Sequence, residues 1–236
     1  MFLPDGIPML VLNCTKAAAE FFRVTRKGEV LSCVEAAPHK TIAESVATPV
    51  FPADVDPQEH DSIQWHWVVH CVTVKRKKYL LVMDYDSRYC LTFLATKKGD
   101  EIDFLNMFEK MMVSNFMFLA NKKGVDSVEV DLAIARYNDK LTTCTFYLRS
   151  DRSVQGHLNE VAWHLERHCY EDGMLLMPNQ FIEFSAFMGQ FPRNAKGRSS
   201  HFFANDVFVD TWLQDIDFDD GPVDTTNLVY LSDYRK

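Results

Sequence analysis

The 236-residue chain has 47% hydrophobic and 25% charged residues, an ordinary globular balance that allows one large domain with a sizeable core. Its formal net charge of −8 argues against a protein that coats nucleic acid in general, because phosphate binding requires a positive field, but it leaves room for a local basic patch. Phe occurs 18 times against 9 Gly and 9 Pro, which predicts a core dominated by aromatic packing.

The cysteines and the first residues indicate the compartment. The 6 cysteines are scattered without a C-x-x-C pair, so neither a disulfide framework nor a zinc-finger spacing is predicted. The opening MFLPDGIPMLVLNC lacks a basic region and is a poor signal peptide. No apolar run reaches the length needed to cross a bilayer. We therefore expect a cytoplasmic protein in a reducing compartment, with no membrane association.

The first elements are a strand, a short helix and a long loop. MLVLNC at residues 9–14 is short, apolar and typical of a strand, and Thr15 can cap a brief helix after it. From residue 23 to 64 the hydrophobic pattern is broken by Pro38, Pro49, Pro52 and Pro57. This segment is predicted to be a long loop or lid.

Three β-rich runs follow, at residues 66–74, 78–86 and 88–96, and short polar turns between them predict an antiparallel meander. The first turn holds the only dense basic cluster of the chain, Lys75, Arg76, Lys77 and Lys78. Basic residues at a hairpin turn usually serve only to keep the turn solvated. An RNA-directed role would need stacking by Trp65, Trp67 and Tyr79, and the net acidity weighs against it, so a nucleic-acid partner is not expected.

Two long helices complete the prediction. Apolar residues recur at three- and four-residue steps after Asp100, a helix cap, and Gly124 stops this first helix. A second helix runs from about Ser153 to Tyr170, and Gly173 ends it. Between them, alternation at 128–135 and a run at 141–148 predict a second hairpin. The predicted fold class is α+β, with antiparallel hairpins backed by two long helices.

The domain prediction places a single α+β domain at residues 1–190 and an acidic extension at 191–236, packed on the domain or trailing from it. Aspartates accumulate after His201, with only Arg235 and Lys236 to balance them. Residues 206–224 could bind a protein partner; the plainer interpretation is a solvated acidic end.

The second long helix also carries a histidine stripe. At 100° per residue, Val154, Leu158, Val161, Leu165 and Cys169 form its buried face. His157, Glu160, His164 and His168 lie on a neighbouring stripe. His164 and His168 are one turn apart, as two ligands of one metal on a helix must be. The H-E-x-x-H pattern is absent, so boundary packing explains the stripe better than a metal site.

The start of the same helix is a candidate anion site. Asp151 or Ser153 can cap it, Arg152 lies beside its first N–H groups, and Gly156 leaves the approach open. The alternative is plain capping, with Arg152 paired to a carboxylate and Gly156 making room for a neighbouring strand.

Three pieces of the chain together resemble a known family. They are the strand running into Cys14-Thr15-Lys16, the Trp-led hairpin ending in LLVMD, and the helix start Arg152-Ser153-Val154-x-Gly156-x-x-Asn159. They are similar to a group of uncharacterised bacterial proteins that open with a Cys-Thr-Lys motif, some of them beside or fused to domains resembling the plasmid-borne ORF-3 protein. The resemblance covers about residues 9–172.

This family resemblance implies a bacterial or mobile-element setting and no particular activity. It adds Lys16 and Asn159 to the candidate site of Arg152, Ser153 and Gly156. The chain departs from the family pattern at His157, where a small residue is usual, and at Gln155, where a hydrophobic one is usual.

The leading hypothesis from the sequence is a non-catalytic binding or regulatory module that recognises a macromolecular partner or a small anion, with no cofactor expected. The alternative is a metal-dependent hydrolase or nuclease, which would place a divalent metal on His157, His164 and His168.

Overall fold

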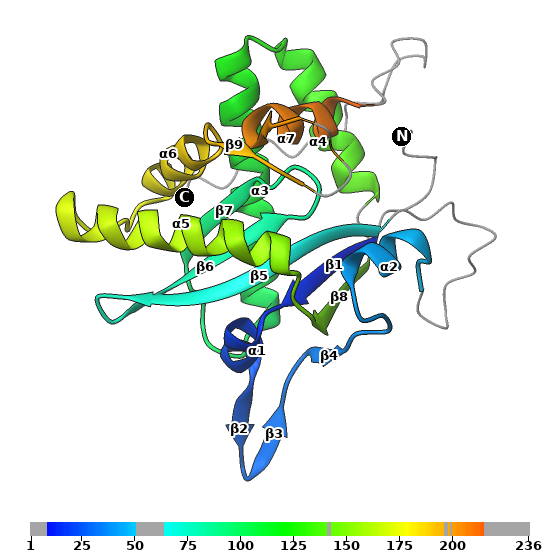
Figure 1. Cartoon of the computed structure of the whole chain (residues 1–236), viewed down its shortest axis with the longest axis vertical. Coiled ribbons are helices and arrows are strands. Elements are labelled where there is room, and N and C mark those ends of the chain that lie inside the picture. Colours follow the sequence, from blue (N-terminus) through cyan, green and yellow to red (C-terminus); the bar gives the residue numbers. More distant parts are fainter. Residues whose placement is uncertain (1–8, 51–63, 141–142, 196–197, 199, 215–236) are drawn as a thin grey trace.

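The computed structural model describes residues 9–50, 64–140, 143–195, 198 and 200–214. A six-stranded mixed sheet forms its centre, in the order β4-β8-β1-β5-β6-β7 (Figure 1). The strands are β1 (Met9–Cys14), β4 (Val34–Ala36), β5 (Gln64–Val74), β6 (Lys77–Asp84), β7 (Cys90–Leu94) and β8 (Thr143–Leu148). Strands β4, β8, β1 and β5 are parallel to one another, whereas β6 and β7 are antiparallel additions. The α+β class is confirmed.

The first strand and its helix are also confirmed. β1 is buried along its whole length, and α1 (Lys16–Phe22) follows it directly. The Thr15 hydroxyl accepts a hydrogen bond from the Ala18 N–H, which satisfies one of the free donors at the helix start. Phe22 at the end of α1 packs edge-on against Phe146 of β8, so α1 is held against the sheet.

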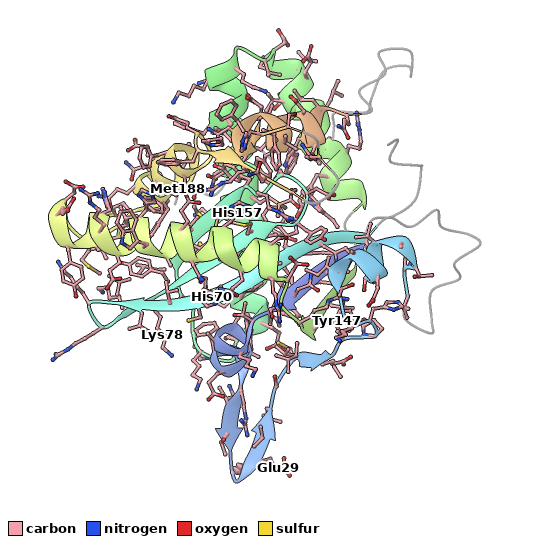
Figure 2. The ribbon with its side chains drawn as sticks, in the orientation of Figure 1. Glu29, His70, Lys78, Tyr147, His157 and Met188 are labelled. Atoms are coloured by element: carbon pink, nitrogen blue, oxygen red, sulfur yellow. The ribbon has the colours of Figure 1, made fainter. Side chains whose placement is uncertain are left out.

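The described part of the Pro-containing segment holds four short elements that the sequence did not predict. They are β2 (Val24–Arg26), β3 (Glu29–Leu31), β4, and α2 (Ile42–Ala47). β2 and β3 form a hairpin that protrudes from the sheet, with Glu29 at its tip (Figures 1 and 2). Residues 51–63 of this segment lie outside the described residues.

The antiparallel meander β5-β6-β7 is confirmed. Lys75 and Arg76 form the two-residue turn between β5 and β6, with φ values of 45° and 67°. Both residues have the left-handed backbone conformation that a type I′ turn requires. The twist of such a turn matches the twist of the two strands that it joins.

The second predicted hairpin is wrong. Residues 128–135 belong to a helix, α4 (Ser127–Lys140), and β8 pairs in parallel with β1 and β4. The polar-apolar alternation at 128–132 matched a strand, but Val130 and Ala133 are buried three residues apart and Val128 is exposed. A helical period of three to four residues therefore decides which side chains enter the core.

The two long helices cover opposite faces of the sheet (Figure 1). α5 (Arg152–Glu171) crosses one face above β5 and β6, with α2 on the same side over the parallel strands. α3 (Glu101–Lys123) covers the other face, where its Phe108 packs edge-on against Trp67 of β5. The apolar stripe predicted for α5 is confirmed, because all five of its residues are buried.

The remaining elements follow α5 in the chain and add to the core. They are α6 (Pro178–Met188), β9 (Pro192–Arg193), β10 (Phe202–Phe203) and α7 (Ala204–Leu213). In α7, Phe208 stacks on Tyr89 with ring centroids 4.4 Å apart, and Trp212 stacks on Phe116 at 4.5 Å. The first part of the acidic extension thus packs on the sheet and α3.

The acidic segment named as a possible partner surface is only partly described. Asp206 and Asp210 both pair with Lys123 of α3, at 3.1 and 3.2 Å. Residues 215–224 lie outside the described residues, so the partner and the division at residue 190 stay predictions. Among the described helices, none is long and apolar enough to cross a membrane.

Candidate functional site

The parallel strands bring three chain segments together at one edge of the sheet. Cys14, the last residue of β1, is paired with Leu148 of β8, and Leu148 is paired with Ala36 of β4. Because the strands are parallel, their carboxyl ends meet at the same edge, and a helix follows each of them. Ligands of open sheets with parallel strands bind outside such carboxyl ends.

A pocket of about 480 Å³, open to solvent, lies at this edge, and we call it the carboxyl-edge pocket. Its lining residues are Cys14, Lys16, Ala36, Ala37, Pro38, His39, Lys40, Leu148, Arg149 and Ser150. Three of them are cationic and none is a carboxylate, although the whole chain has a net charge of −8. The volume falls within the range of small-molecule sites, roughly 300–1,000 Å³.

Arg149 is the buried cation of the carboxyl-edge pocket, with 5% of its surface exposed. Its Nε donates a 2.8 Å hydrogen bond to Asn13 Oδ1. Its Nη1 donates to the carbonyls of His39 and Thr41 and to the Ser45 hydroxyl. The guanidinium therefore ties the end of β8 to β1 and to the start of α2.

No carboxylate of the described chain forms an ion pair with Arg149, and its Nη2 is buried without a hydrogen-bond partner there. Burial lowers the pKa of Arg149, and the nearby Tyr147, Glu44 and Tyr85 raise it in part. The ring centre of Tyr147, a residue labelled in Figure 2, lies 5.9 Å from the guanidinium carbon of Arg149. Burying a charge without a paired counter-charge is costly, and an anion in the pocket would reduce that cost.

Asn13 and His66 form a buried polar cluster with Arg149. The Asn13 amide donates a 3.0 Å hydrogen bond to the Trp67 carbonyl and lies 3.4 Å from His66 Nδ1. Burial, with a contribution from Arg149, lowers the pKa of His66 to about 3. His66 is therefore neutral near pH 7, and Arg149 keeps the only charge in this cluster of three residues.

The predicted anion site at the start of α5 is used for capping. The Asp151 carboxylate accepts hydrogen bonds from the N–H groups of Ser153 and Val154, at 2.9 and 3.3 Å, and from the Ser153 hydroxyl at 2.7 Å. The sequence predicts that these N–H donors face an anion, and in the structure the Asp151 carboxylate accepts their hydrogen bonds. Arg88 Nη2 also donates to the Ser153 hydroxyl, at 3.3 Å.

The other predicted residues of this site are on the surface of α5. Arg152 is exposed and makes no hydrogen bond or ion pair to a described residue. Gly156 is exposed, and a Cβ there would meet nothing within 4 Å, so it does not make room for a strand. Asn159 accepts a 2.9 Å hydrogen bond from Gln155 one turn earlier. Of the predicted set, only Lys16 lines the carboxyl-edge pocket.

The residues of the histidine stripe contact protein groups, and two of them share a partner: Arg193 Nη1 lies 3.3 Å from His157 Nδ1 and also donates to Glu160. His157 Nε2 lies 3.0 Å from the Asn194 carbonyl, on the side of α5 that faces α6 and β9 (Figure 2). Glu160 pairs with Arg193, which is 1% exposed. His168 Nδ1 lies 3.1 Å from Asp172, and the ring of His164 packs against Phe191 at 5.1 Å.

Within the described ranges, no group of three or more His, Cys, Asp or Glu side chains is placed to hold a metal ion. The metal-dependent hydrolase thus stays a prediction without an assembled ligand set.

The basic cluster at residues 75–78 is in part structural. Lys75 Nζ donates a 2.7 Å hydrogen bond to the Cys169 carbonyl at the end of α5 and lies 4.5 Å from the centre of the Tyr170 ring. The aromatic residues considered for stacking are in the core: Trp67 and Tyr79 are 0% exposed. Trp65, partly buried, donates its indole N–H to Asp84. The RNA-directed hypothesis therefore lacks its stacking residues.

All of the cysteines are described, and each is a free thiol. Burial raises the pKa of Cys14 well above its usual range, with smaller contributions from Cys33 and Cys144. Although Cys14 borders the carboxyl-edge pocket beside Lys16, it is therefore a neutral thiol near pH 7 and a poor nucleophile.

The fold and this pocket define an α+β protein with a cationic cavity at the carboxyl edge of its parallel strands. A family model described as a domain of unknown function (DUF6933) matches residues 11–207, from β1 to α7. The chain therefore belongs to the DUF6933 family. No curated protein matches the chain. The matched range contains every residue that lines the carboxyl-edge pocket.

Sequence reasoning missed Arg149, His39 and Lys40. Arg149 directly follows the apolar run at 141–148, and a charged residue at the carboxyl end of a strand is a usable signal. The alternation at residues 128–135 predicts a hairpin partner for this run, and that interpretation does not bring its end beside Cys14. His39 and Lys40 lie in the Pro-containing segment, where no periodicity indicated that β4 joins the sheet.

Proposed function

We propose that this protein is a non-catalytic binding module that holds a small anionic ligand in the carboxyl-edge pocket. The observation that carries the proposal is Arg149, a buried guanidinium without a carboxylate partner in the described chain, at a cavity also lined by Lys16 and Lys40. Arg149 would supply fixed positive charge, because its Nε and Nη1 are already held by protein acceptors. The exposed side chains of Lys16 and Lys40 would form ion pairs with the anion at the rim of the pocket.

The side-chain entropy lost on ligand binding favours this pocket over the exposed start of α5. A rigid, buried cation loses little side-chain entropy when a ligand binds, whereas the exposed Arg152 would have to be immobilised. A charge in a buried setting also interacts more strongly with an anion, because solvent screens it less.

Calorimetric titration of the protein with inorganic phosphate, sulfate and citrate tests the proposal. At least one of these anions should bind to the unmodified protein. The double variant Lys16→Gln, Lys40→Gln should weaken that binding by at least tenfold, because it removes both rim cations and leaves Arg149 in place.

A matched control is the double variant Lys77→Gln, Lys110→Gln. It removes the same charge from two exposed lysines that do not line the pocket. This control should bind the anion nearly as well as the unmodified protein. If no anion binds, or if both double variants lose binding equally, the pocket is not an anion site.

A further inference from the structure

We infer that the ligand is a dianionic phosphate monoester with a compact aliphatic part, an inference that rests on the proposed function. The first reason is charge. Lys16, Lys40 and Arg149 line the pocket without any carboxylate among the lining residues. A monoanion would leave most of that positive charge uncompensated, whereas a phosphate monoester carries close to two negative charges near neutral pH.

The neighbouring carboxylates do not provide the missing compensation. Asp151, next to the lining residue Ser150, accepts three hydrogen bonds at the start of α5. Glu44 on α2 accepts a 3.0 Å hydrogen bond from the Thr41 N–H, and no ion pair among the described residues joins it to Arg149. Both acids cap a helix start, and neither forms an ion pair with a cation of the pocket. Glu44 offsets the charge of Arg149 only in part, so the lining residues keep a net positive charge for the ligand.

The second reason is the size of the cavity. At about 480 Å³ the pocket is far larger than an inorganic anion requires, since a water molecule occupies roughly 30 Å³ in the liquid. A ligand that excludes water from it must therefore carry an organic part beside its phosphate group.

The third reason is the chemistry of the lining. The uncharged lining residues are mainly small or aliphatic: Ala36, Ala37, Pro38 and Leu148, with Cys14 and Ser150. His39 is the only aromatic ring among the lining residues, so there is no pair of rings to sandwich a nucleobase. An aliphatic group would gain from this contact by removing apolar surface from water.

Calorimetry with four probes tests the ligand class: inorganic phosphate, n-butyl phosphate, n-butyl sulfate and adenosine monophosphate. We expect n-butyl phosphate to bind at least tenfold more tightly than inorganic phosphate, because of its aliphatic group. It should also bind at least tenfold more tightly than n-butyl sulfate, which has a similar shape and one negative charge. Adenosine monophosphate should bind less tightly than n-butyl phosphate.

A variant of Leu148 locates the aliphatic contact. Leu148 is 49% exposed, so Leu148→Asn should fold, and it should lower the preference for n-butyl phosphate over inorganic phosphate by about threefold or more. Leu176→Asn is the matched control, because Leu176 is 45% exposed and does not line the pocket. That control should keep the full preference.

The outcomes separate this inference from the proposed function. If no probe binds, the anion-binding function itself is wrong. If inorganic phosphate binds as tightly as n-butyl phosphate, or n-butyl sulfate equals it, anion binding stands and the phosphate-monoester class is wrong. Tighter binding of adenosine monophosphate would assign the pocket to nucleotides instead.

Discussion

Arg149 donates a 2.8 Å hydrogen bond from Nε to Asn13 Oδ1. This bond joins the residue that follows β8 to the penultimate residue of β1. Asn13 is 0% exposed, and its amide in turn donates to the Trp67 carbonyl of β5. One asparagine thus connects the three central parallel strands to the buried cation of the pocket. The hydrogen bond between Arg149 and Asn13 therefore both stabilises the parallel strands and positions the cation of the proposed binding site.

A double-mutant cycle measures this bond. Asn13→Ala should lower the free energy of unfolding by about 2–3 kcal/mol, because it leaves the buried Arg149 Nε without an acceptor. In the presence of Arg149→Met the same change should cost about 1–2 kcal/mol less. Urea denaturation of the four proteins gives the coupling. Additive losses would show that the two side chains do not stabilise each other.

The start of α5 gives a second prediction about stability. Asp151→Ala should lower the free energy of unfolding by about 1–2 kcal/mol, because the carboxylate satisfies two N–H groups and the Ser153 hydroxyl. The neighbouring Arg152→Ala should change it by less than about 0.5 kcal/mol, since Arg152 is exposed. Chemical denaturation of both variants provides the comparison. Equal losses would place Arg152 in a structural contact.

Asp84 predicts a dependence of stability on pH. Burial and the neighbouring Asp86 raise the pKa of Asp84 to about 6, while hydrogen bonds from Ser87 and Trp65 oppose the shift. Below about pH 3 the carboxyl is largely protonated in both the folded and the unfolded state. Between pH 4 and 6 the folded protein holds the proton more tightly than the unfolded chain, so stability falls as pH rises through this window, by up to about 3 kcal/mol.

The Asp84→Asn variant should lack this decline. Denaturation at pH 4 and pH 7 would show a larger loss in the unmodified protein than in the variant, whatever the variant's absolute stability. Asp131→Asn is the control, because Asp131 is exposed on α4, and it should keep the decline of the unmodified protein. Parallel pH profiles for the unmodified protein and Asp84→Asn would contradict the raised pKa.

Local sequence patterns predicted the elements with a clear period. The apolar stripe of α5 from Val154 to Cys169 spans more than four helical turns, so its signal exceeds the noise of single residues. The meander was predictable because its strands are joined by short turns and are adjacent in the chain. Both features depend on residues that are close in sequence.

The carboxyl-edge pocket depends on residues that are far apart. Asn13 and Arg149 are separated by 136 positions, and the pocket also needs β4, a strand of three residues with no usable alternation. Parallel pairing is not encoded by a turn, so the register of β1 with β8 and β4 could not be derived locally. The anion site predicted at Arg152 lies three residues from Arg149 in sequence, and the Asp151 cap separates the two in the chain; this site stays a prediction.

A substitution of Gly156 tests whether the ligand binds at the start of α5 or in the carboxyl-edge pocket. It lies in the first turns of a helix with open space where a Cβ would be, and its φ is not positive. Gly156→Ala should therefore raise the free energy of unfolding by about 0.5–1 kcal/mol, because alanine loses less backbone entropy in a helix. If the ligand binds in the carboxyl-edge pocket, its affinity should be unchanged in this variant. A stabilised protein with markedly weaker anion binding would show that a ligand approaches α5 at Gly156, and would return the site to Arg152 and Ser153.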